Sequence, residues 1–157
     1  MKKLIRNRGI LTALSAIGIA QGLKIFGHKR LTGKWDWRPV FSTGGMPSSH
    51  SAGVSSLATY VAAKNGSSSI ETALAVIFGV IVMYDAQGIR RHTGEIAKLV
   101  NDIDEDIEVL SGHFPGLGHV KQKEELNELL GHQPEEVAYG ALLGIVIGLI
   151  SAKTESE

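Results

Sequence analysis

The segment from residue 44 to residue 51 (GGMPSSHS) places hydroxyl groups and a histidine at the start of an apolar run. Its glycines and proline predict a turn, and Ser48 or Ser49 is a suitable N-cap for a helix that begins there. A helix N-terminus attracts phosphate because its backbone N–H groups are unpaired and the helix dipole is positive at that end. His50 adds a titratable group within the first turn. The pattern is typical of a phosphate site, and equally of a capped helix that enters a membrane.

A second candidate lies in residues 129–144 (LLGHQPEEVAYGALLG). Pro134 suits the first position of a helix, and Glu135 suits its first turn. Glu136 follows His132 by four residues, so its carboxylate can accept a hydrogen bond from one imidazole nitrogen. The other nitrogen would then be free to act as a nucleophile. Because this spacing also occurs by chance, the pair alone does not establish catalysis.

A third group of polar residues follows the most apolar run of the chain. Asp85 ends that run, and Arg90, Arg91 and His92 come directly after it. Arg91 can pair with Glu95 at the i, i+4 spacing of a helix. The two arginines can supply positive charge to an anion, although solvated arginines at the interfacial end of a helix give the same pattern.

Overall composition excludes several classes of function. The 157 residues are enough for one domain, residues 1–157, and the formal net charge of zero argues against a nucleic-acid partner. There is no cysteine, which excludes disulfides, thiolate metal sites and cysteine nucleophiles. His113 and His119 lie in a glycine-rich loop and are a candidate metal pair, but such pairs are more often incidental. We therefore expect no metal and no other cofactor.

Charge is distributed unevenly along the chain. Nine of the sixteen basic residues fall between Lys2 and Arg38, and ten of the sixteen acidic residues fall between Asp102 and Glu136. Such asymmetry sets membrane topology or shapes a site. Lys34 and Arg38 lie just before the first segment described above, so they can neutralise an anion bound there.

Four apolar stretches predict the elements that position these residues. They are residues 9–27, 48–63, 69–84 and 137–152. A spanning helix needs about 20 mainly apolar residues, and these runs reach that length only with their flanks, so a soluble bundle of buried helices is an alternative. The basic leader before the first run and the scarcity of polar residues in the third and fourth favour a membrane. A cleaved signal peptide at the N-terminus would still leave the later runs in need of one.

We therefore predict an all-α protein, a small polytopic transmembrane helix bundle of about four spans. Between the third and fourth runs, residues 86–100 are expected to continue the third helix beyond the bilayer, and the acidic residues 102–108 to be solvated. Residues 111–119 indicate a loop, and residues 121–130 a short amphipathic helix.

Small residues recur every four positions in two of the runs. Gly18 and Gly22 form one pair, and Gly140, Gly144 and Gly148 form a longer series. This spacing places a small-residue groove on one helix face, where another helix can approach closely. The longer series predicts close packing and offers a surface for a homo-oligomer.

The four-span count brings the three polar groups together. The start of the second span, the end of the third and the start of the fourth must lie on the same side of the membrane. His50, Arg90, Arg91 and His132 therefore converge on one membrane face.

The blocks GGMPSSHSA, YDAQGIRRHTGEIAKLVN and GHQPEEVAYGALLG together resemble the divergent branch of the type-2 phosphatidic acid phosphatase superfamily. This superfamily also includes bacterial acid phosphatases and vanadium haloperoxidases. The resemblance covers about residues 9–150, and the superfamily pattern is K-x6-R-P, then P-S-G-H, then S-R-x5-H-x3-D. It implies a membrane phosphatase that hydrolyses a lipid phosphomonoester or diphosphate without a metal.

The resemblance assigns roles to the matching positions. Ser48 and Ser49 stand in the second block, whose serine and backbone bind phosphate, and His50 there protonates the leaving group. His132 matches the nucleophile that becomes phosphohistidine. Glu136 replaces the aspartate that orients this histidine.

The basic residues of the pattern match less well. Arg38 corresponds to the first-block arginine, but its lysine partner would fall at Leu31, so that Lys34 or Arg30 would have to replace it. The third-block arginine would fall at Leu126. Its charge would then have to come from the arginine pair at positions 90 and 91. Two alternatives to an active phosphatase stay open: a non-catalytic module that binds anionic lipid headgroups, and a structural membrane protein.

The orientation in the membrane follows from the basic leader, Lys2, Lys3, Arg6 and Arg8. Basic residues favour the cytoplasm, so the leader predicts a site on the extracytoplasmic face of a bacterial plasma membrane. Basic residues near the site oppose this assignment, unless several of them bind phosphate. The expected partners are membrane lipids and a lipid phosphate substrate.

Overall fold

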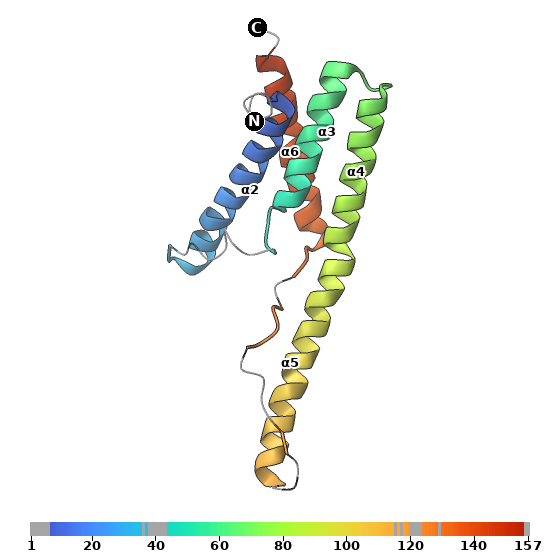
Figure 1. The fold of residues 1–157 in the computed structure, drawn as a ribbon. Helices are drawn as coiled ribbons and strands as arrows, with labels where there is room; N and C mark the ends of the chain where they lie inside the picture. The colour runs from blue at the N-terminus through green and yellow to red at the C-terminus, as the bar shows by residue number, and fades with distance from the viewer. Residues whose placement is uncertain are drawn as a thin grey trace.

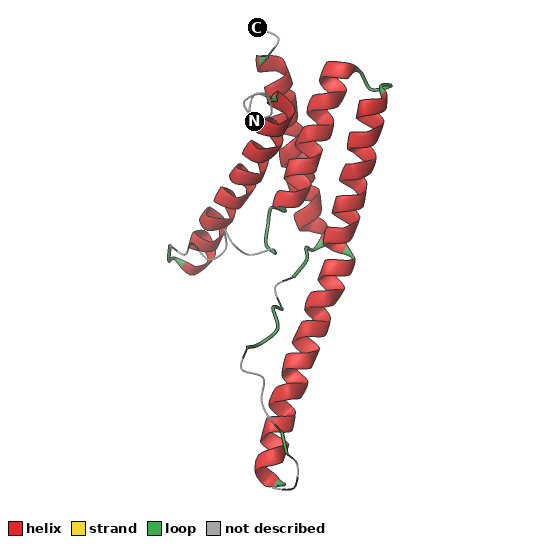
Figure 2. Cartoon of the chain, in the orientation of Figure 1, coloured by secondary structure: helices red, strands yellow, loops and turns green. Residues whose placement is uncertain are grey.

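A computed structural model shows the protein as a bundle of helices with one long projecting arm (Figure 1). The structure describes residues 7–35, 37, 44–114, 116, 118–119, 124–128 and 130–155. Within these residues there is no strand (Figure 2). The helices are α2 (Arg8–Thr32), α3 (Ser49–Asn65), α4 (Ile70–Gln87), α5 (Ile89–His113) and α6 (Pro134–Thr154). The predicted all-α fold is confirmed.

Short polar residues begin the bundle helices at the expected points. The side chains of Asn7, Ser48 and Ser69 accept hydrogen bonds from backbone N–H groups in the first turns of α2, α3 and α4, respectively. Each cap satisfies a donor that the helix itself leaves unpaired. Of the two caps that the sequence offered, Ser48 and Ser49, the structure uses Ser48, and α3 begins directly after it.

Helix α3 lies at the centre of the bundle, in contact with α2, α4 and α6. Its closest neighbour is α6, which presents the three glycines at four-residue spacing, Gly140, Gly144 and Gly148. A Cβ atom at any of them would collide with a backbone carbonyl oxygen of α3. The predicted close packing is confirmed. Since the groove is filled by α3 of the same chain, a homo-oligomer would have to use another face.

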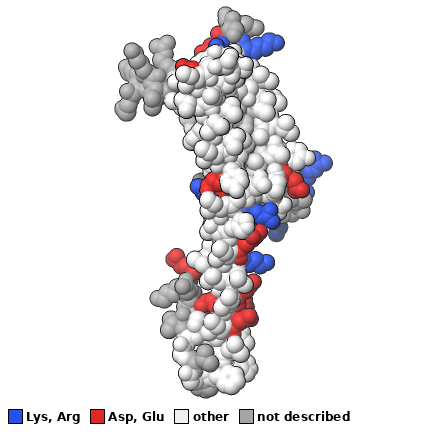
Figure 3. Space-filling view, turned by 90° about the vertical axis from the view of Figure 1, so that its right-hand side faces the viewer, with Lys and Arg blue, Asp and Glu red and all other residues white. Residues whose placement is uncertain are grey.

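The outer surface of the bundle is apolar. By length and composition, three helical segments can cross a membrane: Arg8–Arg30, Ile70–His113 and Pro134–Thr154. Helix α3 has 17 residues, about 25 Å at 1.5 Å per residue, and it is buried among them. Large apolar side chains such as Leu74, Phe78 and Leu142 point outward. Figure 3 shows a broad uncharged band over the bundle, as lipid contact requires.

Helix α5 continues α4 well beyond the other helices (Figure 1). The two are separated at Gly88, whose φ of −94° and ψ of −89° interrupt the helix. The expected continuation of the third run is thereby confirmed, and it extends further than predicted. The acidic residues 102–108 belong to this arm and are mostly exposed, and acidic side chains mark it in Figure 3.

The short amphipathic helix predicted over residues 121–130 is wrong for its described part. Residues 124–128 and 130 are not helical. They lie against α5, where the Asn101 side-chain amide donates to the carbonyl oxygen of Leu126 and accepts from its backbone N–H. The N–H and C=O of Leu126, which a helix would pair within itself, are paired with a side chain of α5 instead. The helical spacing of apolar residues therefore did not determine the conformation of this segment.

Candidate functional site

Three segments that are distant in the sequence meet at one end of the bundle. The backbone N–H of Ser48 donates to the carbonyl oxygen of Glu136 at 3.0 Å, which joins the start of α3 to the start of α6. The backbone N–H of His132 donates to the carbonyl oxygen of Ala86 at 2.9 Å, which joins the segment before α6 to the end of α4. These bonds hold the polar groups singled out in the sequence within one small region.

His132 lies at the centre of this region and is only 2% exposed. Its Nδ1 is 3.0 Å from Oε2 of Glu136, and the same oxygen accepts the backbone N–H of Gln133 at 3.1 Å. An ionised carboxylate can only accept, so Nδ1 of the imidazole carries the proton. The lone pair of the ring is consequently on Nε2. The spacing of four residues has produced the orientation that the sequence indicated.

The Nε2 atom of His132 is buried and has no hydrogen-bond partner. Buried polar atoms are nearly always paired, and an unpaired one calls for an explanation. The ring of His50 lies edge to face with that of His132, with 5.9 Å between the centroids and 62° between the planes. An unpaired nucleophilic nitrogen beside a second titratable ring is an arrangement that acid–base and nucleophilic chemistry require.

Burial also sets the protonation of His132. Loss of hydration disfavours the imidazolium and lowers the pKa of His132 below the ordinary value for histidine. The hydrogen bond to the Glu136 carboxylate raises the pKa, but by less. The lysine and arginine charges nearby lower it further. The imidazole is therefore neutral at physiological pH, which is the form that can attack an electrophile.

Three buried serines lie at the start of α3. Ser48 and Ser51 are fully buried, and Ser49 is nearly so. The hydroxyl of Ser48 accepts the backbone N–H of Ser51 at 3.3 Å and the hydroxyl of Ser51 at 3.0 Å. The start of α3, with its positive dipole end, thus lies in the same region as His50 and His132.

Lys24 is the residue that the sequence reasoning missed. It lies on α2, is 4% exposed, and donates from Nζ to the carbonyl oxygen of Gly44 at 2.8 Å. Its charge acts on Glu136 and on both His50 and His132. Lys24 therefore brings a buried positive charge to the histidine pair.

The spacing of residues along α2 indicates that the side chain of Lys24 points into the bundle. The residues of that helix that are most buried recur every four positions, as Thr12, Ala16, Ala20 and Lys24. A lysine that continues a face of small residues points into the bundle, whereas a lysine on the opposite face would point to lipid or water.

The two arginines predicted to face the site behave differently. Arg90 pairs with Asp85 at 2.7 Å, and its charge also acts on both histidines. Arg91 pairs with Glu95 at 3.1 Å and lines a polar pocket together with His132 and Glu136. Both arginines are held by carboxylates at the edge of the site.

The remaining predicted basic residues lie elsewhere or outside the described residues. Lys34 follows the end of α2, is exposed, and bonds through its backbone to Thr32. Arg38 lies outside the described residues, so the structure does not place it.

A short strap, residues 124–128 and 130–132, carries His132 along the side of α5. At the end far from His132, the Asn101 side chain donates to the carbonyl oxygen of Leu126 at 3.0 Å and to Oε1 of Glu128 at 2.8 Å, and it accepts from the backbone N–H of Leu126 at 2.9 Å. Along the way the strap lies so close to Gly94 that a Cβ there would meet its backbone. Near its end Gly131, with a φ of +84°, lies against the backbone of Arg91. The helix thus fixes the course of the chain that ends in His132.

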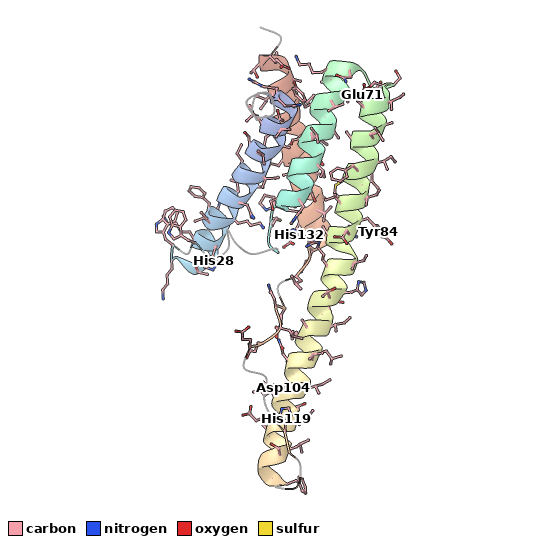
Figure 4. The ribbon with its side chains drawn as sticks, in the orientation of Figure 1. His28, Glu71, Tyr84, Asp104, His119 and His132 are labelled. Carbon is pink, nitrogen blue, oxygen red and sulfur yellow. The ribbon has the colours of Figure 1, made fainter. Side chains whose placement is uncertain are left out.

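The histidines considered as a metal pair have separate partners. The Nδ1 atom of His113 lies 2.9 Å from the carbonyl oxygen of Val109, and Nε2 of His119 lies 3.0 Å from Asp104. Figure 4 shows His119 and Asp104 together on the arm, far from His132. Within the described residues, no three His, Asp or Glu side chains stand close enough to hold a metal ion.

Comparison with known proteins decides the family. Residues 5–147 match the family described as the Divergent PAP2 family. The chain belongs to this family. It is also 43% identical to the uncharacterized membrane protein YuiD of Bacillus subtilis (strain 168), over 96% of this chain and 97% of that protein.

Membership of the Divergent PAP2 family confirms the resemblance read from the three blocks. The match with a membrane protein over almost the whole chain, together with the long apolar helices, makes this an integral membrane protein. No solved structure matches the fold. The function of this member of the Divergent PAP2 family is therefore argued from the geometry around His132.

Proposed function

We propose that the protein is a membrane phosphatase that hydrolyses a lipid phosphomonoester or diphosphate through a phosphohistidine at His132. One observation carries the proposal. The buried imidazole of His132 has its Nδ1 held by Glu136 and its Nε2 unpartnered beside His50. A nucleophile, the group that orients it and a neighbouring acid are the parts that covalent catalysis needs.

In the first half of the reaction, Nε2 of His132 attacks the phosphorus atom. A nitrogen–phosphorus bond forms as the bond from phosphorus to the leaving oxygen breaks. Burial and the neighbouring positive charges lower the pKa of His50, whereas the negative charge of a bound phosphate favours its protonated form. In that form His50 gives its proton to the leaving oxygen, so the alcohol or the shorter phosphate leaves neutralised by one proton. Glu136 keeps the proton on Nδ1 and stabilises the positive charge that the ring acquires.

In the second half, water attacks the phosphohistidine. His50, now neutral, takes a proton from the water as the new oxygen–phosphorus bond forms. The nitrogen–phosphorus bond breaks, inorganic phosphate is released, and His132 is restored with its lone pair on Nε2. Both histidines return to their starting protonation, so no metal or other co-reactant is needed.

Positive charge around the transferred group determines the rate of such reactions. Lys24 and Arg90 supply it here, since both act on the histidine pair. Arg91 borders the adjoining pocket. The start of α3, capped by Ser48, adds its dipole. The proposal includes Ser49 as a further phosphate contact, with Arg38 as a contact from the segment before α3, but not Lys34, which is exposed after the end of α2.

A lipid substrate is favoured because the site lies at the end of an apolar bundle. Lipid phosphates are concentrated at that depth of a bilayer. The basic leader of the chain favours a site on the extracytoplasmic face of a bacterial plasma membrane, and the proposal includes this orientation. A tag on the C-terminus tests this orientation, since it should be accessible only after the membrane is opened.

One observation favours the second candidate, a non-catalytic module that binds anionic headgroups. The position of the third-block arginine is taken by Leu126, which is part of the strap beside Asn101. The arginines nearest the site are engaged by Asp85 and Glu95. A pocket with a buried nucleophile but diverted arginines can bind phosphate without transferring it.

Phosphate release from a panel of lipid phosphates and diphosphates, with purified protein in the presence of a chelator, tests the proposal. We expect release by the native protein, loss of release in His132→Ala, and a matched control, His113→Ala, that behaves as native. His113 lies at the far end of α5. Equal release by His132→Ala would overturn the mechanism. Saturable headgroup binding by the native protein without turnover on any substrate would establish the second candidate.

A further inference from the structure

The exposed surface of α2 changes in chemistry along its length. In the first part of the helix the outward side chains are apolar, as at Leu14, Ile19 and Leu23. Phe26 ends this series, and His28, Lys29 and Arg30 follow it directly. The segment long and apolar enough to span a membrane ends at Arg30. The order from aliphatic to aromatic to basic is the order of layers from the bilayer core to its headgroups.

The chain turns back on itself at the end of this helix. Gly33, with a φ of +73°, donates its backbone N–H to the carbonyl oxygen of Lys29 at 2.8 Å. A left-handed residue suits this position because it ends the helix and redirects the chain. The turn brings Trp35 alongside the last two turns of α2.

Trp35 there joins an aromatic and a basic side chain in one cluster. Its ring meets that of Phe26 edge to face, with centroids 5.8 Å apart. The ammonium of Lys29 lies 3.8 Å above the centre of the Trp35 ring. Phe26 and Trp35 are 61% and 56% exposed, so the protein builds the cluster without covering it.

We propose that Phe26, Lys29 and Trp35 form an anchor that binds the phosphate-bearing headgroup layer of the bilayer. The indole suits that layer because its body is apolar and its N–H needs a polar partner. Lys29 brings its positive charge to that layer with its ammonium over the indole ring, and the exposed face of the cluster leaves this charge open to lipid phosphates. A lipid surface fits better than a protein partner, because the cluster continues a lipid-facing helix and follows the layering of a bilayer.

Exposed tyrosines on two other helices mark the same level. Tyr84, at the end of α4, is 77% exposed, and Tyr139 is exposed near the start of α6. Figure 4 shows Tyr84 and His132 at the same end of the bundle, where α2 also ends near His28. The tyrosine at the opposite end, Tyr60, donates instead to Glu155 at 2.6 Å. The aromatic belt of the protein is thus concentrated on the side of the site.

The anchor is separate from the proposed catalytic groups but is tied to them through α2. Lys24 precedes Lys29 by five residues, about 8 Å along the helix axis. Holding Lys29 at the headgroup layer fixes how deep Lys24 and the site lie. Binding of the anchor to lipid does not depend on the protein being a phosphatase.

The two tryptophans of the chain, Trp35 and Trp37, allow a direct test. In Trp37→Phe, fluorescence comes from Trp35 alone. The protein is reconstituted in vesicles that contain anionic lipid and a nitroxide quencher, placed either on the headgroup or near the end of an acyl chain. We expect the headgroup quencher to act on Trp35 more strongly than the deep one, by about twofold or more.

A Lys29→Gln change in the same background tests the role of the cation. We expect it to weaken the headgroup quenching of Trp35 and its dependence on anionic lipid, while the matched change Lys64→Gln at the opposite end leaves both as before. Stronger quenching of Trp35 by the deep label would overturn the anchor, as would quenching by an aqueous quencher alone. An unchanged profile in Lys29→Gln would overturn the part assigned to lysine. Circular dichroism checks that each variant keeps its helices.

Discussion

The two ends of the bundle carry polar groups of similar kind but treat them in opposite ways. At the end without histidines, Arg8 donates to Thr154 at 2.7 Å, while Tyr60 and Lys64 both contact Glu155. Partners are found within the protein, and the groups are largely exposed. At the other end His132 leaves a buried nitrogen unpaired and Lys24 is buried with its charge. At one end the polar groups pair with one another near the surface, and at the other end two polar groups are buried.

This contrast separates polar groups that join the helices from polar groups that are buried at a cost in free energy. Exposed ion pairs contribute little to folding, so the contacts of Glu155 chiefly tie α3 to α6. A buried unpaired nitrogen and a buried ammonium cost free energy unless something compensates them. Among the described residues of the bundle, both lie at the end that holds His50 and His132. The following changes test this contrast, from the largest expected effect to the smallest.

The change Glu136→Gln should have the largest effect. Glutamine keeps the size of the side chain but removes the charge that stabilises the ring of His132 during attack. We expect the turnover rate to fall by about 10³-fold or more, as when the carboxylate of a catalytic triad is replaced. Glu135→Gln is the matched control, because Glu135 is exposed on the same turn. Phosphate release measures both, and equal rates would remove Glu136 from the mechanism.

Replacing Lys24 by methionine should come next. The change keeps the length of the side chain and removes the buried charge, so we expect a loss of about 10²-fold in turnover. Lys24→Arg should recover part of the rate. Lys64→Met removes a lysine from the opposite end and should leave turnover as it is. If Lys24→Met kept the native rate, the charge at the site would have to come from the arginines alone.

Removing the hydrogen bonds that hold the strap to α5 should lower turnover less than the Lys24 change does. Asn101→Ala removes the bonds to Leu126 and Glu128 that fix the course of the chain to His132. We expect about a tenfold fall in kcat with little change in KM, because small displacements of a nucleophile are costly. Ser111→Ala, which breaks only a bond to the Glu108 carbonyl oxygen further along α5, is the control. A rise in KM with kcat unchanged would contradict a positioning role for Asn101.

The pH dependence should follow the lowered pKa of His132. Because the neutral ring attacks, the acid limb of kcat/KM should hold as the pH falls through the ordinary value of about 6.5 and decline only below it. In Glu136→Gln the carboxylate no longer raises the pKa, so the acid limb of the residual kcat/KM should decline at a still lower pH. An acid limb that declines at or above the ordinary histidine value would show that burial does not control this group.

The same shift links pH to stability. The unfolded chain protonates His132 at the ordinary pKa, whereas the folded protein does so at a lower one. Over the interval between the two pKa values the unfolded state binds more protons, so this group makes the protein less stable as the pH falls. Thermal unfolding across that interval measures the effect.

The smallest effect is expected at the opposite end. Glu155→Gln weakens the contacts of Tyr60 and Lys64 but touches nothing at the site. Phosphate release should stay within about twofold of native. A large loss would show that the two ends are coupled through α3 and α6, and the contrast between them would no longer hold.

The sequence was sufficient for the parts of the molecule that depend on local pattern. Apolar runs predicted the helices, the cap at Ser48 fixed the start of α3, and the glycines of α6 predicted its tight contact. The pairing of His132 with Glu136 also followed from spacing, because a carboxylate in the first turn of α6 reaches back to the residues just before the helix. In each case a few neighbouring residues determine the geometry.

The features that the sequence did not predict depend on partners far along the chain. Residues 124–130 have a helical spacing of apolar side chains, but Asn101, twenty-five positions before Leu126, pairs with their backbone instead. Lys24 reads as an isolated polar residue until α2 is placed against α3 and α6. Its role follows from which face of α2 is buried, which packing decides.

The rod formed by α4 and α5 extends well beyond the other helices. At 1.5 Å per residue its 44 residues measure about 66 Å, twice the thickness of a bilayer's hydrocarbon core. The outer half therefore reaches far beyond the bilayer's hydrocarbon core. Since the strap is bonded to this half at Asn101 and to α4 at Ala86, it spans the interruption at Gly88, and the position of His132 depends on the angle between α4 and α5.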